Sequence, residues 1–115
     1  MSSLVKKMEC THITNNIREL SDELRRNLNA ELVHKNIVEL DSGTVALLAF
    51  ECYYFRCGGY VSLTIMLTEK EGIQTADIIG SGGGEGISNI SFGANSSFAN
   101  KAIKILQNYG FTEIN

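Results

Sequence analysis

A segment of alternating hydrophobicity between two glycine-containing turns constrains the fold of this chain more than any other feature of its sequence. Apolar side chains occupy every second position of Val61–Leu67, which is the pattern of a β-strand with one buried face. Gly58-Gly59 precedes this strand and Glu71-Gly72 follows it, and both are typical of tight hairpin turns because glycine supplies positive φ angles. The sequence therefore predicts consecutive antiparallel strands over residues 44–57, over residues 60–69 and after Gly72.

The two turns also predict which side chains share a face of the sheet, because a hairpin turn sets the pairing register. A two-residue turn at Gly58-Gly59 places Cys57 opposite Tyr60. One face then gathers a mainly apolar set: Phe50, Cys52, Tyr54, Arg56, Val61, Leu63, Ile65, Leu67, Ala76, Ile78 and Gly80. The other, nominally polar face also receives large apolar side chains, namely Tyr53, Phe55, Met66 and Ile79, with Val45 and Leu47 as further candidates. This second set suggests an interface, since aromatic and Met side chains are enriched at such surfaces.

Two amphipathic helices are predicted, one near each end of the chain. Thr14, Asn15 or Asn16 can cap the start of the first. The second begins after a cap at Asn95 or Ser96, and Gly110 suits the left-handed position just beyond its end. The apolar stripes are Ile13, Ile17, Leu20, Leu24 and Leu28 in the first helix, and Phe98, Ala102, Ile105, Leu106 and Tyr109 in the second.

These elements predict a two-layer α+β fold in a single domain of residues 1–115. Further strands are expected over residues 4–13 and 31–41, and a short one over Ile87 to Phe92. The predicted order is strand, helix, four or five antiparallel strands, helix, which gives a sheet of five or six strands. Both helices should pack on one face of the sheet and leave the other face open. The register before residue 44 is left undetermined.

Charge and cysteine content narrow the class of protein. The formal net charge is -3, which disfavours nucleic-acid binding because such proteins usually carry a basic stripe. We find no N-terminal signal and no apolar run of the ~20 residues that span a bilayer, so we expect no membrane association. The three cysteines form an odd set without a CxxC pair, which favours free thiols. We therefore expect a cytoplasmic protein without a metal or cofactor.

The glycine-rich segment from Gly80 to Gly86 is the most conspicuous candidate site. Backbone N–H groups of such a loop can cradle a phosphate, usually with a helix N-terminus directly behind. The segment lacks the lysine of a Walker A loop, fails the GxGxxG fingerprint in every frame, and precedes the predicted helix by more than ten residues. A bent connection between strands is the favoured interpretation, and the alternative is a ligand loop made of Gly82, Gly83, Gly84, Glu85 and Gly86.

Two residue pairs are candidates for nucleophilic or acid–base chemistry. Cys10 and His12 lie on the same face of a predicted strand. His34 lies opposite Glu51 if Ser42-Gly43 forms a two-residue turn, and a His–carboxylate pair can exchange protons. Neither pair has recognisable further ligands or oxyanion donors, so packing residues and an ordinary ion pair are the favoured interpretations.

Two features together resemble small uncharacterised bacterial proteins that are grouped as a domain of unknown function. They are the strand–Gly-Gly–strand hairpin, and the strand, Ser-Gly-Gly loop, short strand and terminal helix from Ile78 to Tyr109. The likeness covers residues 44–109. It implies a bacterial cytosolic protein with five or six strands and no assigned activity.

The sequence favours a non-enzymatic interaction domain that forms a homo-oligomer through its open sheet face. The alternative is a domain that binds a small hydrophobic ligand in a cavity between the sheet and the C-terminal helix, with residues 82–86 at its mouth. A small enzyme that uses one of the two residue pairs comes third, and phosphate binding by the glycine-rich loop comes fourth.

Overall fold

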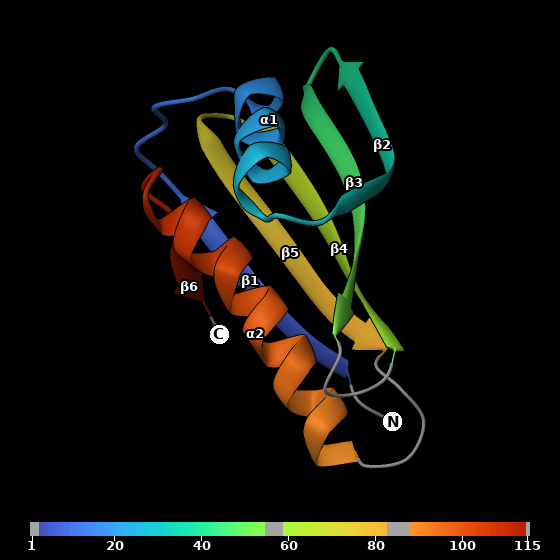
Figure 1. Ribbon diagram of the computed structural model, residues 1–115. Coiled ribbons are helices and arrows are strands. Elements are labelled where there is room, and N and C mark those ends of the chain that lie inside the picture. Colours follow the sequence, from blue (N-terminus) through green and yellow to red (C-terminus); the bar gives the residue numbers. More distant parts are fainter. Residues whose placement is uncertain (1–2, 55–58, 83–87, 115) are drawn as a thin grey trace.

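A six-stranded antiparallel sheet carries two helices on one face (Figure 1). The computed structural model describes residues 3–54, 59–82 and 88–114. The strands are β1 (Ser3–Cys10), β2 (Glu31–Leu40), β3 (Gly43–Tyr54), β4 (Gly59–Lys70), β5 (Ile73–Gly82) and β6 (Thr112–Ile114), and the helices are α1 (Ile17–Asn27) and α2 (Ser88–Gln107). The predicted α+β fold, with both helices on one side of the sheet, is confirmed.

The spatial order of the strands is β2-β3-β4-β5-β1-β6. Strands β2 to β5 form a meander, in which each strand pairs with the next one along the chain. The first strand completes the sheet, since β1 pairs with β5 from Ser3 opposite Ser81 to Cys10 opposite Gln74. The short β6 pairs with the outer edge of β1. The two ends of the chain therefore contribute neighbouring strands.

The turn between β4 and β5 is the predicted one. Lys70 lies opposite Ile73, and the two turn residues, Glu71 and Gly72, have φ angles of 54° and 78°. Positive φ angles at both central positions are typical of a type I′ hairpin turn. The predicted faces of β4 and β5 follow from this turn, and Ala76 and Ile78 are fully buried on the covered side.

The predicted register between β3 and β4 is wrong by four residues. Tyr53 lies opposite Tyr60, where the sequence placed Cys57. The predicted turn at Gly58-Gly59 is therefore absent, because Gly59 is paired with Tyr54 inside the sheet. A shift by an even number of residues leaves every side chain on its predicted face, so the hydrophobic pattern is compatible with both registers.

The β2–β3 hairpin lacks the two-residue turn at Ser42-Gly43 that a pairing of His34 with Glu51 requires. Leu40 pairs with Gly43, so Asp41 and Ser42 form the turn. The register then shifts between Leu32 and His34, where Val33 is an extra residue on β2. Such a β-bulge bends the edge strand and changes which residues face each other beyond it.

Helix α1 is capped by Asn16, one of the three predicted capping residues. The Asn16 side chain accepts a hydrogen bond of 2.8 Å from the backbone N–H of Glu19, and the Glu19 carboxylate accepts one of 2.9 Å from the Asn16 N–H. This reciprocal pair is a capping box. At the other end Asn29 has a φ of 54°, which turns the chain away from the helix into β2.

Helix α2 begins earlier than expected. The strand predicted over Ile87 to Phe92 is wrong, since Ser88 to Phe92 belong to the helix. A short apolar run can be read as a strand or as part of a helix, because Ile87 and Ile90 are also three residues apart. The sixth strand instead follows the helix, as β6.

The end of α2 matches its prediction. Gly110 has a φ of 91° and donates a backbone hydrogen bond of 3.2 Å to the carbonyl oxygen of Gln107. The N–H of Phe111 donates a bond of 3.1 Å to the carbonyl oxygen of Leu106. These two bonds define a Schellman motif, which satisfies the last helical carbonyls. Phe111 then enters the core at 2% exposure.

The core lies between the helices and the covered face of the sheet. Its largest members are fully buried side chains from both helices and from five of the six strands or their ends: Met8, Ile17, Leu20, Leu24, Leu28, Leu48, Phe50, Leu63, Ile65, Leu67, Ile78, Phe98, Leu106 and Phe111. The predicted stripes of both helices contribute to it, except for Ile13, which precedes α1 and is only partly buried. Neither α1 nor α2 covers the opposite face of the sheet (Figure 1).

Candidate functional site

The open face of the sheet collects most of the exposed apolar side chains. Strand pairing places all the large exposed apolar side chains on this face, with Val33 at the bulge as the exception among the residues whose side chains are described. They are between 36% and 67% exposed. The set is Val5, Val38, Leu40, Leu47, Tyr53, Tyr60, Met66, Ile73, Ile79 and Ile114.

A continuous apolar row crosses the middle of this face. Leu47 on β3 lies directly opposite Met66 on β4. Ile79 on β5 is the diagonal neighbour of Met66, and it lies directly opposite Val5 on β1. Directly opposed side chains are about 4.5–5.5 Å apart at Cβ, and diagonal ones remain within reach of long side chains. We call Val5, Leu47, Met66 and Ile79 the apolar row.

A pair of opposite charges lies beside the apolar row. Lys7 on β1 lies directly opposite Asp77 on β5, and both side chains point to the open face. Asp77 is in turn opposite Met66 on β4. A polar neighbour next to an apolar centre is the usual make-up of a protein–protein interface.

Three of the four predicted interface residues occupy their predicted face. Tyr53, Met66 and Ile79 are exposed on the open side, at 52%, 38% and 41%. Phe55 lies outside the described residues. Sequence reasoning missed Val5, because the pairing of β1 with β5 is not encoded in any hairpin turn.

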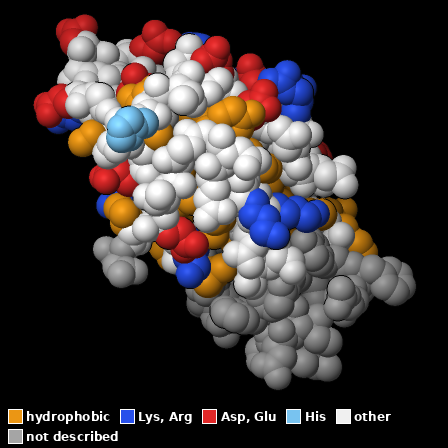
Figure 2. All heavy atoms as spheres, turned by 90° about the vertical axis from the view of Figure 1, so that its left-hand side faces the viewer, with side chains coloured by type: hydrophobic (Ala, Val, Ile, Leu, Met, Phe, Trp, Pro, Cys, Tyr) orange, Lys and Arg blue, Asp and Glu red, His pale blue; other side chains and the backbone are white. Residues whose placement is uncertain are grey.

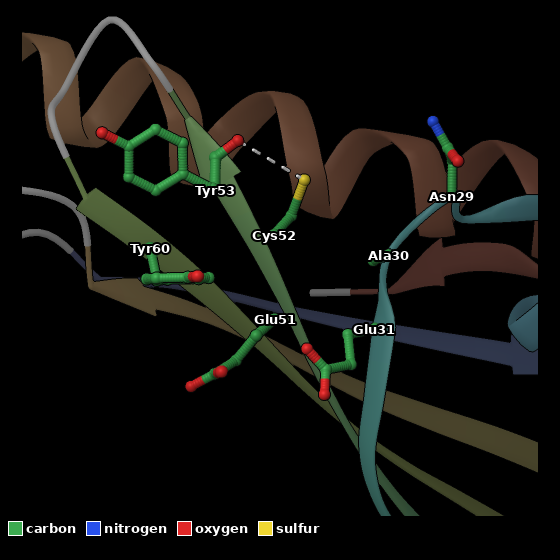
Figure 3. Close-up of a pocket in the computed structure, with 7 residues that line it drawn as sticks. All are labelled: Asn29, Ala30, Glu31, Glu51, Cys52, Tyr53 and Tyr60. Atoms are coloured by element: carbon green, nitrogen blue, oxygen red, sulfur yellow. Dashed lines mark hydrogen bonds between the residues drawn. The ribbon is translucent and has the colours of Figure 1, made fainter.

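A hollow of about 320 Å³ lies at one corner of the open face (Figure 3). Tyr53 and Tyr60 stand at one end of it and Asn29 and Ala30 at the other, with Glu51 and its neighbour on β2 between them. The full lining is Asn29, Ala30, Glu31, Glu51, Cys52, Tyr53 and Tyr60.

The hollow forms because two neighbouring strands stop pairing at this corner. The β2–β3 ladder ends at Glu31 opposite Glu51, yet β3 continues to Tyr54 with β4 as its partner. On the β2 side the chain leaves the sheet at once, since Asn29 has a positive φ and leads back to α1. The edge of β3 beyond Glu51 therefore faces a gap.

Two glutamates and two tyrosines are among the residues that line the hollow. Glu31 and Glu51 are directly opposed on neighbouring strands, an arrangement that like charges disfavour. Both are exposed, and neither takes part in any of the ion pairs of the described residues. The rings of Tyr53 and Tyr60 meet edge to face, with centroids 5.3 Å apart and planes at 73°.

The structure does not bring together the two members of either candidate pair, His34 with Glu51 or Cys10 with His12. His34 lies opposite Ala49, while Glu51 lies opposite Glu31, because the hairpin turn falls at Asp41-Ser42 and the bulge follows. No hydrogen bond or ion pair links His34 to Glu51 among the described residues. The Cys10 thiol is buried and approaches the backbone oxygens of His12, at 3.4 Å, and Tyr109, at 3.6 Å, while the His12 ring is exposed.

The glycine-rich loop falls mostly outside the described residues. Gly82 ends β5 with a φ of 96°, and Gly83, Gly84, Glu85 and Gly86 are not described. The start of α2 at Ser88 places a helix much closer to this loop than the sequence suggested. The distance to the next helix therefore no longer counts against a ligand loop, and the ligand loop itself stays a prediction.

The predicted ligand cavity would lie between α2 and the sheet. The described side chains there are tightly buried: Phe98, Ala102 and Leu106 are at most 1% exposed and belong to the same cluster as Met8 and Ile78. Two hollows that described residues line are found elsewhere, one at the β3 edge and one beside the β2–β3 turn, and the ligand cavity under α2 stays a prediction.

One polar network ties α1 to the segment that directly follows α2. The Tyr109 hydroxyl donates a hydrogen bond of 2.8 Å to Glu23, which also receives one of 2.6 Å from Arg26. The hydrogen bond from Tyr109 is the main cause that lowers the pKa of Glu23, and the nearby Arg26 charge and the Asn27 amide add to it, whereas partial desolvation opposes it. The same bond raises the pKa of Tyr109. This contact stabilises the packing of α1 and α2.

The surface beside α2 carries mixed charge. Figure 2 shows the side that lies to the left in Figure 1, where acidic and basic side chains intermingle with hydrophobic ones and do not gather by sign. No helix in the described part of the chain has both the length and the hydropathy to cross a membrane. Within the same residues, no three His, Cys, Asp or Glu side chains are grouped as metal ligands would be.

These features define a small α+β protein whose antiparallel sheet is covered by helices on one face and exposes an apolar row and a corner hollow on the other. The chain belongs to the Family of unknown function (DUF6054), whose family model matches residues 1–110. The predicted resemblance to a family of unknown function is confirmed, and the match extends beyond the residues 44–109 that suggested it. No curated protein matches the chain.

Proposed function

We propose that this protein is a non-enzymatic interaction domain of the cytoplasm that self-associates through the open face of its sheet. The observation that supports this most is the apolar row. Its four members lie side by side across four strands and are between 38% and 67% exposed. Removing such a row from water is favourable in proportion to its apolar area.

A second copy is a suitable partner for this face because two identical sheets can pack face to face. Two antiparallel sheets pack face to face with their strands roughly aligned, about 30° apart, and interdigitate the side chains of their inner faces. A two-fold axis in the plane of contact would bring the apolar row of one copy against that of the other. The free thiols Cys10 and Cys52 agree with the proposed reducing compartment.

Sedimentation velocity over a range of protein concentrations tests the proposal. We expect the wild type to shift toward a dimer as the concentration rises, and Met66→Asp to stay monomeric because it places a charge in the centre of the row. Val33→Asp is the matched control, since Val33 is 53% exposed at the bulge on the edge strand and outside the row. A wild type that stays monomeric at every concentration, or a Met66→Asp variant that still dimerises like the wild type, would show the proposal to be wrong.

A further inference from the structure

We propose that the corner hollow binds an organic cation of the alkylammonium type, with Glu31 and Glu51 as counter-charges and Tyr53 and Tyr60 as aromatic walls. This site is separate from the apolar row, and it is complete within one chain. It therefore goes beyond the proposed self-association and does not depend on it.

The hollow and its rings supply the shape of the site. Tyr53 and Tyr60 both line the hollow and meet edge to face at 73°, and the face of an aromatic ring is electron-rich. A cation within about 6 Å of such a face is attracted by the ring quadrupole. The hollow is open to solvent and has a volume of about 320 Å³, so it has room for a compact ligand only.

The carboxylates supply the charge. Glu31 and Glu51 are directly opposed across the β2–β3 ladder and lie at the same hollow as the rings. Both lack an ion-pair partner within residues 3–54, 59–82 and 88–114. Like charges that face each other destabilise the free protein. A bound cation would remove this repulsion, and the relief would add to the free energy of binding.

The mixture of rings and carboxylates favours an organic cation over a metal ion. Calcium takes about six to eight oxygen ligands, and two exposed carboxylates supply only part of such a shell. Aromatic walls contribute nothing to that shell, whereas they contact the carbon atoms of an alkylammonium group directly. The N–H groups of a primary amine also need acceptors, and the lining residues Glu31, Glu51 and Tyr60 carry oxygen atoms of that kind.

A titration with propylammonium chloride, followed by amide NMR spectra of the full chain, tests the proposal. Sodium chloride at equal ionic strength is the reference. We expect saturable shifts at Glu31, Glu51, Tyr53 and Tyr60, because their amides line or adjoin the hollow. Shifts that fail to saturate, or that sodium chloride reproduces, would rule the site out.

Variants separate the contributions of charge and rings. Glu51→Gln keeps the size of the side chain and should weaken binding by about tenfold, which corresponds to about 1.4 kcal/mol. Tyr60→Leu should weaken it by roughly two- to fivefold, as expected for one exposed cation–π contact. Glu9→Gln is the matched control, since Glu9 points to the same face of the sheet from β1, far from the hollow. Equal affinities of Glu51→Gln and Glu9→Gln would refute the assignment.

The dimerisation variant distinguishes this site from the proposed function. Met66→Asp leaves the lining of the hollow unchanged, so it should bind propylammonium as tightly as the wild type does. Loss of binding in Met66→Asp would mean that a second copy completes the site, which contradicts a site within one chain. Intact binding together with a monomeric wild type would uphold the cation site while the self-association proposal fails.

Discussion

Replacing Gly43 with alanine should destabilise the protein, because β3 and β4 approach each other closely at this position. A Cβ atom on Gly43 would overlap the backbone carbonyl oxygen of Glu69, and it would lie 3.2 Å from the carbonyl carbon and 3.4 Å from the Cα of Lys70. All three atoms belong to backbone, so a side-chain rotation cannot relieve the overlap. The end of the ladder, where Thr44 pairs with Glu69, would have to open.

The size of the effect follows from what opening the ladder removes. One or two backbone hydrogen bonds would be lost, each worth about 0.5–1.5 kcal/mol net. Replacing glycine also restricts the unfolded chain, which stabilises the folded state by about 0.4–1 kcal/mol. We therefore expect a net loss of about 1–2 kcal/mol. For a domain of this size that is a fall in Tm of roughly 4–10 °C.

Thermal and urea denaturation of Gly43→Ala, compared with wild type, measures this loss. In the register that the sequence suggested, Cys57 opposite Tyr60 would place Gly43 opposite Gln74, which is beyond the end of β4. Alanine would then be neutral or stabilising, so the two registers predict opposite signs. Gly72→Ala is a comparison variant that introduces backbone strain without a steric overlap. Gly72 has a φ of 78°, and a Cβ added there would meet no atom within 4 Å. We therefore expect a loss of about 1–2 kcal/mol from the left-handed conformation alone. A Gly43→Ala protein as stable as wild type would refute the observed register.

Two further predictions concern the contacts of α2. Tyr109→Phe should flatten the pH dependence of stability at both ends. The lowered pKa of Glu23 contributes to the free energy of unfolding above the unfolded value of 4.5, and this contribution is lost as pH falls through the folded pKa. The raised pKa of Tyr109 contributes below the unfolded value of 10.0, and this contribution is lost as pH rises through the folded pKa. Urea midpoints across the pH range would show both changes, and an unaltered profile would contradict the role of this hydrogen bond. Leu106→Ala should cost about 2–5 kcal/mol in the same denaturation assay, because Leu106 is fully buried, and a loss below 1 kcal/mol would contradict the tight packing of α2 on the sheet.

The faces of the sheet could be predicted from the sequence because side chains alternate along a strand, so that a register error of an even number of residues does not change the face. The assignment of Met66 and Ile79 to the open side remained correct although the β3–β4 register was wrong by four residues. The turn at Glu71-Gly72 was predictable for a different reason, since a turn with two positive φ angles restricts the residues that can occupy it. Gly58-Gly59 carried the same signal without forming that turn. Local turn chemistry therefore predicted one hairpin and misled in the other.

The start of α2 could not be predicted from local signals. Asn95 and Ser96 are favourable capping residues, but they lie inside the helix, which begins at Ser88. Capping preference marks where a helix is able to begin, while packing against the sheet can override it. The consequence for function is direct, because phosphate binding by a glycine-rich segment depends on how closely a helix N-terminus follows it.

The corner hollow was beyond sequence reasoning, because it results from three features that act together. The bulge at Val33 shifts the β2 register by one residue and so brings Glu31 opposite Glu51. The left-handed Asn29 ends β2 pairing there, and the actual β3–β4 register brings Tyr53 opposite Tyr60 beside the gap. In the sequence-based pairing, His34 would have faced Glu51 and the corner would have held an ordinary ion pair. The same acidic residue thus changes from a satisfied surface charge to one that lacks an ion-pair partner within the described chain, and this change gives the cation proposal its physical basis.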